Sequence, residues 1–497
     1  MKAQGVPLVI KESRNSLPLI IGIYALVVFW TIWHHEPWRD EAQVWLLCRE
    51  LSLGSLFHEL PYNGHPFLWY LLVFPLPKLG LPYLSMGILH GVIIVTAAWV
   101  FLKRAPFPLY FKIMFLFSYF MIYEYAAIAR NYSISVLLLF LLAGLYRSKH
   151  ERPILFGFLI ALLCNTNTHS IFAAGAMGLL FLISVYKHKA DITSMNKQWF
   201  GLAIMIAGAG FAFFSLRVQA DGWQPWLENP VSWGESLEAI GNAFVPLCLT
   251  NPGMTLLFKP WWVNVMFVLF LIVTLYSIRK SAEAVIFFSL ATLGLLYILT
   301  FRYSGYLRHY GLIFMFLIVA IWIFWEENIG NGKTLTMKFD YPLFSFFVFR
   351  LLSIFLILSL VIGAKYVVKD LRYPFSGAKE MAEYIQKKNI KTEIISAYNI
   401  YTITAIFPYL PGVSWWDPGL ERRCNFIHWD KDYSKSRMLM EEEFMQRSLT
   451  QTEGKHSYYI LLCKPLLDPR KYGLILEYAA NNANITGDEK YYLYRNL

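Results

Sequence analysis

Charged residues are scarce in this 497-residue chain: Asp, Glu, Lys and Arg make up 15% of it, against about a quarter in soluble domains. The short alternating segments of membrane β-strands are lacking as well. In their place stand apolar runs of roughly 15–20 residues, long enough to cross a ~30 Å hydrocarbon core as helices. A helix satisfies its own backbone hydrogen bonds in lipid. The sequence therefore predicts a polytopic α-helical membrane protein.

Several chemical signatures are missing too. Glycine-rich phosphate loops, zinc-type histidine pairs and Ser-His-Asp signatures do not occur. The five cysteines are scattered, and none forms a metal-type pair. Cys424 and Cys463 could form a disulfide if their domain is extracytoplasmic. No small-residue cleavage site follows the apolar run 17–33, so it is interpreted as a retained helix and not a signal peptide.

The net charge of +11 is explained by cytoplasmic loops and anionic lipid, without nucleic acid. The positive-inside rule then orders about eleven transmembrane helices. The stretch 67–80 is short and contains Pro75 and Pro77, so it is expected to be re-entrant or interfacial. A full span there would put the later basic loops on the wrong side. The expected helices are 17–33, 83–101, 109–123, 132–146, 153–167, 170–186, 199–216, 261–278, 283–300, 310–325 and 343–363.

This topology predicts two domains. Residues 1–364 form a transmembrane domain with outer loops at 34–66, 124–132 and 217–259. Residues 365–497 are expected outside as a small α/β domain. There KEMAEYIQKKN is typical of an amphipathic helix, EIISAY and YYILLC of strands, and PYLPG of a turn.

The first outer loop opens with an acidic pair, Asp40 and Glu41, just beyond the first helix. Residues 42–60 have apolar residues at helical spacing and are expected to form one amphipathic helix on the membrane surface. His65 follows it. The acids could simply cap this helix, since carboxylates favour helix N-termini. Capping and catalysis are compatible, because one acid of the pair can cap while the other reacts.

Three further groups of polar residues are expected on the same outer side. The loop 124–132 could hold helix ends together by a salt bridge, and the turn 165–169 could be a plain loop. The stretch 302–309 suits a lipid-linked phosphate, because arginine matches phosphate oxygens with a planar fork; contact with bulk lipid headgroups is the alternative. Trp223, Trp226 and Trp233 in the long loop could roof a cleft or lie on the membrane. The candidate side chains are Glu124, Arg130, Asn131, Tyr132, His169, Arg302, Arg308 and His309.

The order of these motifs resembles a known family. The matching segments are Asp40-Glu41-Ala42, Gly64-His65-Pro66-Phe67-Leu68-Trp69-Tyr70 and Ala129-Arg130-Asn131-Tyr132-Ser133. They resemble the GT-C fold glycosyltransferases that use polyprenyl-phosphate sugars. Within these, the chain is most similar to bacterial relatives of dolichyl-phosphate-mannose protein mannosyltransferases and of the lipid A aminoarabinose transferase. The resemblance covers about residues 17–190.

The resemblance implies an inverting transfer of a sugar from a polyprenyl-phosphate donor to an acceptor glycan, lipid or protein. It places the protein in a bacterial inner membrane with its site facing outward. Asp40 would be the catalytic base, with Glu41 beside it, and Arg302, Arg308 and Arg130 would meet the donor phosphate. The substrate-binding side chains would be His65, Glu124, Asn131, Tyr132, His169 and His309.

The sequence departs from the family in one respect. Members often carry an acid in the second outer loop, where this chain reads Ala-Arg-Asn-Tyr and its nearest acid is Glu124. Some relatives also bind a divalent cation near the acidic pair. His65 and Glu41 could contribute to such a site, but no ligand set is specified by the sequence.

Two other functions compete with transfer. A transporter or flippase of lipid-linked sugars predicts charges midway along helices and two similar halves. Neither is found in the sequence, where the charges fall at helix ends. A non-catalytic membrane scaffold that displays the C-terminal domain would leave the motifs of the first loop unexplained.

Overall fold

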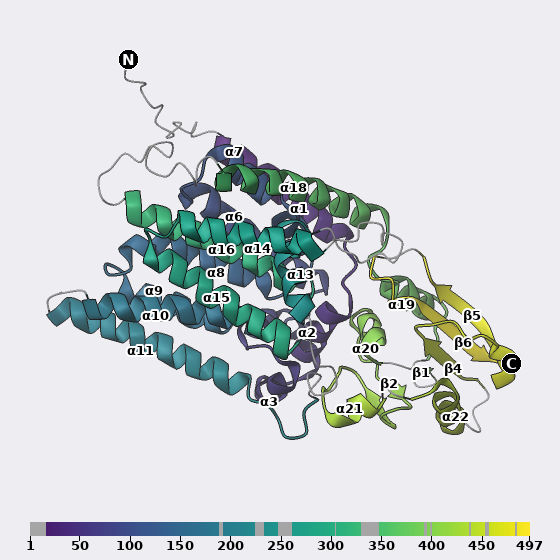
Figure 1. Ribbon diagram of the computed structural model, residues 1–497. Coiled ribbons are helices and arrows are strands. Elements are labelled where there is room, and N and C mark those ends of the chain that lie inside the picture. Colours follow the sequence, from purple (N-terminus) through teal and green to yellow (C-terminus); the bar gives the residue numbers. More distant parts are fainter. Residues whose placement is uncertain are drawn as a thin grey trace, which may run out of the picture.

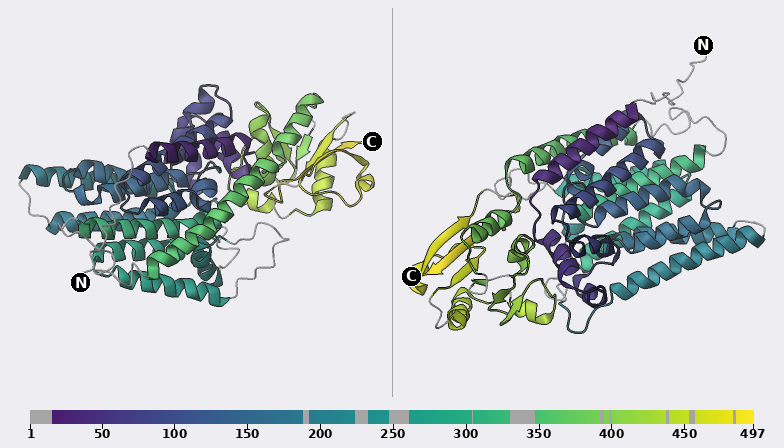
Figure 2. Two further views of the ribbon diagram at one scale, coloured as in Figure 1. Left: turned by 90° about the horizontal axis from the view of Figure 1, so that it is seen from above. Right: turned by 180° about the vertical axis from the view of Figure 1, so that it is seen from behind.

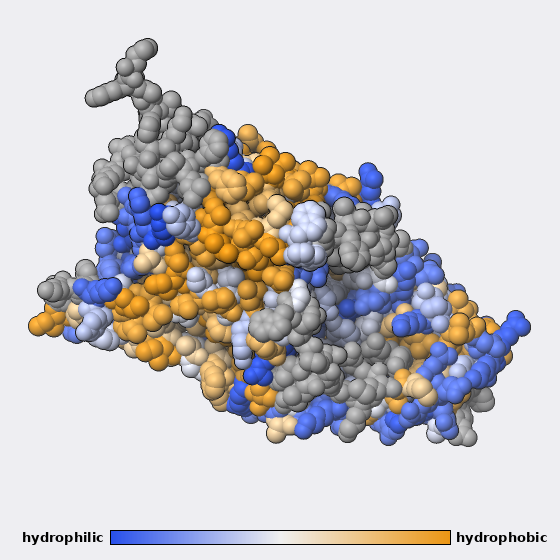
Figure 3. All heavy atoms as spheres, in the orientation of Figure 1, coloured by the Kyte–Doolittle hydropathy of each residue, from blue (hydrophilic) through white to orange (hydrophobic). Residues whose placement is uncertain are grey.

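The computed structural model describes residues 16–187, 192–223, 233–246, 261–303, 305–329, 347–391, 395–397, 400–436, 439–452, 457–482 and 485–497. These residues form a bundle of long helices with a smaller domain, built on a mixed β-sheet, at one end of it (Figure 1). The same arrangement is visible from two other sides (Figure 2). On the face seen in Figure 3, the described surface of the bundle is mostly apolar and that of the sheet domain is mostly hydrophilic. The chain is a multi-pass membrane protein with a C-terminal α/β domain, as predicted.

Seven of the described helices are long and apolar enough to cross a membrane. They are α1 (Ser16–His34), α6 (Leu84–Arg104), α10 (Ile171–Lys187), α11 (Ile192–Ser215), α15 (Ala282–Phe301), α16 (Leu307–Ile329) and α18 (Phe349–Arg372). Three apolar helices are shorter, namely α8 (Tyr132–Leu145), α9 (Pro153–Cys164) and α14 (Trp261–Ser277). These ten match ten of the eleven expected helices. The expected domain boundary at 364/365 falls inside α18.

The one remaining expected helix, 109–123, is not continuous. It forms α7 (Leu109–Leu116) and then a π-helix, η1 (Phe120–Glu124). Between them the N–H of Tyr119 donates to the hydroxyl of Ser359 on α18 at 3.1 Å, outside the helical ladder. Gly363 allows α18 to approach this segment closely, because a Cβ at position 363 would lie only 2.8 Å from the side chain of Ile122. The break carries the chain toward the loop that holds Arg130.

The stretch 67–80 does not form a spanning helix. It folds as α4 (Leu68–Val73) and α5 (Pro75–Lys78). At 1.5 Å per residue, even the longer of the two extends only about 9 Å. The expectation of a re-entrant or interfacial segment is consistent with this length.

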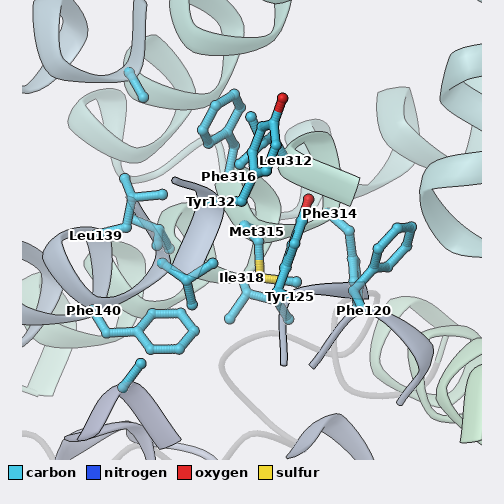
Figure 4. Packing of buried hydrophobic residues seen from close by; sticks show 14 of the residues in the cluster. Phe120, Tyr125, Tyr132, Leu139, Phe140, Leu312, Phe314, Met315, Phe316 and Ile318 are labelled. Carbon is cyan, nitrogen blue, oxygen red and sulfur yellow. The ribbon is translucent and has the colours of Figure 1, made fainter. Parts of the chain in front are cut away.

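Helix α16 runs through the middle of the bundle. From Leu312 to Phe324 every side chain is buried, as expected of a helix that is apolar on all sides. Figure 4 shows its residues packed against Tyr125, Tyr132 and Phe140. This packing fixes the start of α16, where Arg308 lies.

The amphipathic segment 42–60 is two helices, not one. The chain breaks at Leu51 between α2 (Arg39–Glu50) and α3 (Leu53–Asn63), and Ser52 caps α3 by accepting from the N–H of Ser55 at 3.1 Å. Nor does α2 lie on an open surface, because both of its faces are covered. Val44, Trp45 and Leu47 pack into the core of the bundle, whereas Ala42 and Leu46 pack into the core of the C-terminal domain. Helix α2 therefore joins the two domains.

The long outer loop is only partly a loop. Residues 217–223 and 233–246 are described, and Pro225 and Trp226 lie outside the described residues. Residues Trp233–Phe244 form a helix, α13, whose Phe244 packs between Phe267 and Phe314 of the bundle. Trp223 stacks on Trp429 of the C-terminal domain with ring centroids 5.5 Å apart.

The C-terminal sheet has six described strands in the order β3-β2-β1-β4-β6-β5. Strand β1 is parallel to β2 and β4, and the remaining pairs are antiparallel. The expected helix at 379–389 and the strands at 393–398 and 458–463 correspond to α19, β1 and β4. The strands are β1 (Ile395–Ala397), β2 (Trp415–Asp417), β3 (Arg422–Cys424), β4 (Tyr459–Leu462), β5 (Leu474–Ala480) and β6 (Tyr491–Asn496). The helices are α19 (Ala378–Lys387), α20 (Ile400–Ile403), η7 (Thr404–Tyr409), α21 (Lys431–Ser436), α22 (Glu441–Thr452) and η8 (Pro469–Tyr472).

The disulfide that the sequence left open is not formed. Cys424 ends β3, Cys463 follows β4, and both thiols are free. Two strands separate β3 from β4 in the sheet. Three strand spacings amount to about 14 Å, whereas a disulfide requires Cα atoms within roughly 7 Å.

We therefore expect reducing agent to leave the protein unchanged. Dithiothreitol should shift neither the melting temperature of the purified protein nor its circular dichroism, because no bond between Cys424 and Cys463 exists to be broken. Mass spectrometry after alkylation under non-reducing conditions should find both thiols modified. A mass corresponding to a 424–463 cross-linked peptide would contradict the sheet order.

Candidate active site

Asp40 lies at the first turn of α2 between two arginines from distant parts of the chain. Its Oδ2 accepts from Arg308 Nη2 at 3.0 Å and lies 3.2 Å from Arg130 Nη1. Arg130 Nη1 also donates to the backbone carbonyl of Asp40 at 2.9 Å. The side chains of all three residues are 10–14% exposed. A carboxylate and two guanidinium groups thus share one nearly buried site with a net charge of +1.

The charge state of Asp40 follows from these neighbours. Burial alone would raise the pKa of its carboxyl, but the positive charges of Arg130 and Arg308 hold that pKa below its ordinary value. The carboxylate is therefore ionised at neutral pH and able to accept a proton.

His65 extends the site on the side of Arg130. Arg130 Nη2 donates to His65 Nε2 at 3.2 Å; a guanidinium cannot accept, so the ring proton of a neutral His65 is on Nδ1. Burial and the charge of Arg130 hold the pKa of His65 well below its ordinary value. His65 is therefore neutral, and its Nδ1 has no hydrogen-bond partner among the described residues.

A group of aromatic rings extends the site on the side of Arg308. The rings of His169 and His309 are 4.2 Å apart, and that of Tyr132 is 5.8 Å from His309. His309 Nδ1 accepts from the N–H of Tyr306 at 2.8 Å, which leaves its proton on Nε2. In the described part of the chain, neither nitrogen of buried His169 has a partner. Buried polar atoms in proteins normally have a partner, so these nitrogens are candidates to bind a water molecule or a polar ligand.

Glu41 has a different role from Asp40. Its side chain is buried, and its Oε2 accepts from the N–H of Trp38 at 3.2 Å, as in a capping box. Its Oε1 accepts from the N–H of Ala129 at 2.7 Å. The same carboxylate contacts His35 at 3.1 Å. Glu41 therefore caps α2, whereas Asp40 is directed at the arginines and stays the candidate for the base.

Two of the residues predicted for the site make no hydrogen bond to Asp40. Glu124 is buried and accepts from the hydroxyl of Tyr119 at 2.6 Å, and its carboxylate also interacts electrostatically with Arg308. Arg302 follows α15 with an exposed side chain, and no contact joins it to Asp40 in the described structure. Asn131 is buried just before α8, next to Arg130. The structure thus gathers Asp40, Arg130, Arg308, His65, Tyr132, His169 and His309.

Some side chains at the site carried no signal in the sequence analysis. The guanidinium carbon of Arg308 lies 5.3 Å from the ring centre of Trp38 and 4.9 Å from that of Tyr306. Tyr401, from the C-terminal domain, lies 4.4 Å from the guanidinium of Arg39, next to Asp40. In the sequence, aromatic residues near each polar motif were the only indication of such rings. They could not indicate Tyr401, which lies more than 300 residues after Asp40.

A divalent cation does not fit the donor set around Asp40. Within the described ranges, no three His, Cys, Asp or Glu side chains gather as metal ligands. Of the two residues offered by the sequence, Glu41 is engaged with Ala129, and His65 binds Arg130 through Nε2, which leaves a single open nitrogen, Nδ1 of His65. The two guanidinium groups already supply positive charge at Asp40. No step of the reaction is therefore assigned to a metal.

No protein-family model matches the sequence, and no curated protein matches it. The structure is similar to that of ArnT from Cupriavidus metallidurans, a GT-C glycosyltransferase whose crystal structure was determined bound to undecaprenyl phosphate. The TM-score is 0.54 at 9% sequence identity, and the match covers 98% of each chain. The predicted GT-C fold is confirmed over the length of both proteins.

Proposed function

We propose that the protein is an inverting glycosyltransferase that moves a sugar from a polyprenyl-phosphate donor to an acceptor hydroxyl. The observation that carries the proposal is the nearly buried Asp40 between Arg130 and Arg308. It occurs on the fold of ArnT, a protein seen with a polyprenyl phosphate bound. A base and two cations in one place are what this transfer requires.

In the proposed reaction Asp40 accepts the proton of the acceptor hydroxyl. The acceptor oxygen forms a bond to the anomeric carbon as the bond from that carbon to the phosphate oxygen breaks. A single displacement of this kind inverts the anomeric configuration. The phosphate gains negative charge as it leaves, and the guanidinium groups of Arg130 and Arg308 stabilise that charge. Polyprenyl phosphate leaves readily, so no second acid is needed.

The hydrogen bonds of the arginines leave room for the phosphate. Arg308 uses Nη2 for Asp40, while its Nε has no partner among the described residues. A phosphate oxygen that reaches this buried Nε would therefore gain a donor that Asp40 does not use. The net charge of +1 at the three side chains also matches the single negative charge of a sugar phosphodiester.

The placement of the basic residues supports a site on the outer face. Lys103 and Arg104 end α6, and Lys149 pairs with Glu283 at the start of α15. Asp40 belongs to α2, which lies at the end of the bundle that faces the C-terminal domain (Figure 1), and Arg308 contacts Asp40 there. The positive-inside rule then puts the site and that domain outside the cytoplasm. The membrane would be a bacterial inner membrane, where polyprenyl-phosphate sugars are presented.

The assay uses the purified protein in proteoliposomes with a panel of undecaprenyl-phosphate-linked sugars and a total extract of envelope lipids and glycans as acceptor. We expect one member of the panel to be consumed, with release of undecaprenyl phosphate and a product of opposite anomeric configuration. Mass spectrometry and NMR of the product measure both. A lipid-linked sugar that crosses the bilayer without being consumed would support a flippase and contradict the proposal.

A further inference from the structure

His35 is a buried histidine just beyond α1 that the proposed reaction does not use. Its Nδ1 lies 2.8 Å from Asp370 Oδ2, and its Nε2 lies 3.1 Å from Glu41 Oε2. The three side chains are at most 2% exposed. Both partners are carboxylates, and an imidazole donates through both nitrogens only when it carries two protons. With both carboxyl groups ionised, this geometry is satisfied by a cationic His35 that donates through both ring nitrogens.

The surroundings of His35 agree with that charge. Burial by itself would lower its pKa, but Asp370 and Glu41 together raise the pKa of His35 to about 10. Other titratable groups also interact with it: Glu36 next in the chain, Glu124 on η1 and His90 on α6. Most of these groups are carboxylates and favour the imidazolium.

Glu41 connects His35 to the site. It directly follows Asp40 in α2, and its other oxygen accepts from the N–H of Ala129, the residue before Arg130, at 2.7 Å. One carboxylate therefore holds the backbone next to the proposed base and next to one of its cations. A shift of Glu41 would move Asp40 and Arg130 relative to each other.

Asp370 connects His35 to the C-terminal domain. It lies in the last turn of α18, two residues before that helix ends at Arg372. The ring of Phe375, which follows, packs against His35 with centroids 4.6 Å apart. The imidazolium therefore links the start of the C-terminal domain to the helix that carries Asp40.

We propose that His35 is a positioning residue. As a cation between Asp370 and Glu41, it fixes the position of Asp40 relative to Arg130. Assembly of the site therefore depends on the docking of the C-terminal domain. This inference rests on the proposed function of Asp40. Misplacing a reacting group by about 1 Å lowers rates by roughly 10²-fold, so we expect a loss of that order when the link is broken.

The test compares His35→Gln with His34→Gln, the same change at the preceding, exposed residue, whose ring contacts the carbonyl and the ring of Trp30 in its own helix. Turnover is measured with the panel sugar that the wild-type protein consumes fastest. His35→Gln should lower kcat about 10- to 100-fold, and His34→Gln should leave it unchanged. His35→Lys, which keeps the charge, should recover part of the loss.

A double-mutant cycle separates positioning from a general loss of packing. Asp370→Asn should lower kcat to a similar degree, and His35→Gln with Asp370→Asn together should be no worse than either alone, because both break one link. Additive losses would contradict the link. If His35→Gln does not fold, the comparison of Asp370→Asn with His35→Lys carries the same test, since the first removes a carboxylate partner and the second retains the cation.

The pH dependence of stability gives an independent measurement. The pKa of about 10 for folded His35 lies above the ~6.5 of an unfolded histidine. Its contribution is therefore fully present below pH ~6.5 and is lost as the pH rises through about 10. The melting temperature of the wild type should fall across this window more steeply than that of His35→Gln.

Two failures are distinguishable. If Asp40→Asn retains transfer, the proposed function is wrong, whatever His35 does. If Asp40→Asn is inactive while His35→Gln turns over like the wild type, the function stands and the positioning role is wrong. Equal losses in His35→Gln and His35→Lys, with both proteins folded, would also overturn the role of the charge.

Discussion

Asp40→Asn is expected to lower kcat for sugar transfer by roughly 10²–10⁴-fold, the range that a general base contributes. The amide has the shape of the carboxylate but cannot accept the proton of the attacking hydroxyl. The site offers no obvious replacement, because Glu41 is occupied by the N–H groups of Trp38 and Ala129. Initial rates in the proteoliposome assay measure the change.

The affinity of Asp40→Asn for undecaprenyl phosphate should not fall with its activity. Asp40 neutralises part of the charge of Arg130 and Arg308, so the Asn variant presents a more positive site. We expect it to bind undecaprenyl phosphate as tightly as the wild type or more tightly, and to be stabilised by that lipid against heat. Asp468→Asn, an exposed acid on the C-terminal domain, is the matched control. An active Asn variant, or one that loses both activity and lipid binding, would contradict the role of a base.

Much of the bundle could be predicted because lipid imposes one strong rule. Each apolar run long enough to cross the membrane has to be helical, and basic residues such as Arg104 and Lys149 orient the runs. The rule does not predict where a helix is interrupted by a break or a π-helical turn. The break before η1 depends on Ser359 and Gly363, which belong to a helix some 240 residues further along the chain.

The amphipathic segment 42–60 shows a different limit. Its pattern correctly indicates that one face is apolar, but the same pattern fits a helix on lipid and a helix between two domains. Ala42 and Leu46 are covered by the C-terminal domain. The surface that covers an amphipathic helix is determined by tertiary structure, and the pattern of a single sequence does not identify it.

The site itself was partly predictable. Asp40, Arg130 and Arg308 stand at or near the ends of helices, and the topology predicted from the sequence places them on one side of the membrane. Topology could not choose between Arg302 and Arg308, since six residues separate them and both fit the motif. The choice is made by the start of α16, whose first turn directs Arg308 at Asp40, whereas Arg302 follows the end of α15.

His35 and Asp370 could not be paired from the sequence. They are 335 residues apart, and Asp370 reads as a charged residue at the end of an apolar helix. Only the return of α18 to the outer end of α1 brings the two together. Hydrophobic periodicity in a sequence indicates secondary structure, and it does not indicate which distant charged residues pair.

Arg308→Gln should lower transfer by roughly 10²–10³-fold, the range observed when a donor that stabilises a developing negative charge is removed. The variant loses the guanidinium that contacts Asp40 and the free Nε that we assign to the phosphate. Binding of undecaprenyl phosphate should weaken at the same time, in contrast to Asp40→Asn. Arg279→Gln, which removes an exposed arginine from the end of α14 that rests on Tyr276, is the control and should behave as the wild type.

The pH profile of this variant tests the electrostatics directly. Burial raises the pKa of Asp40, and Arg130 and Arg308 lower it; without Arg308 the pKa must therefore rise. Because the base acts only when deprotonated, the acid limb of kcat should move to higher pH in Arg308→Gln. Arg308→Lys keeps one positive charge and should shift the limb less, while still binding the lipid less tightly than arginine does, since a single ammonium cannot match the fork. An acid limb that stays in place in both variants would mean that the titrating base is a residue other than Asp40.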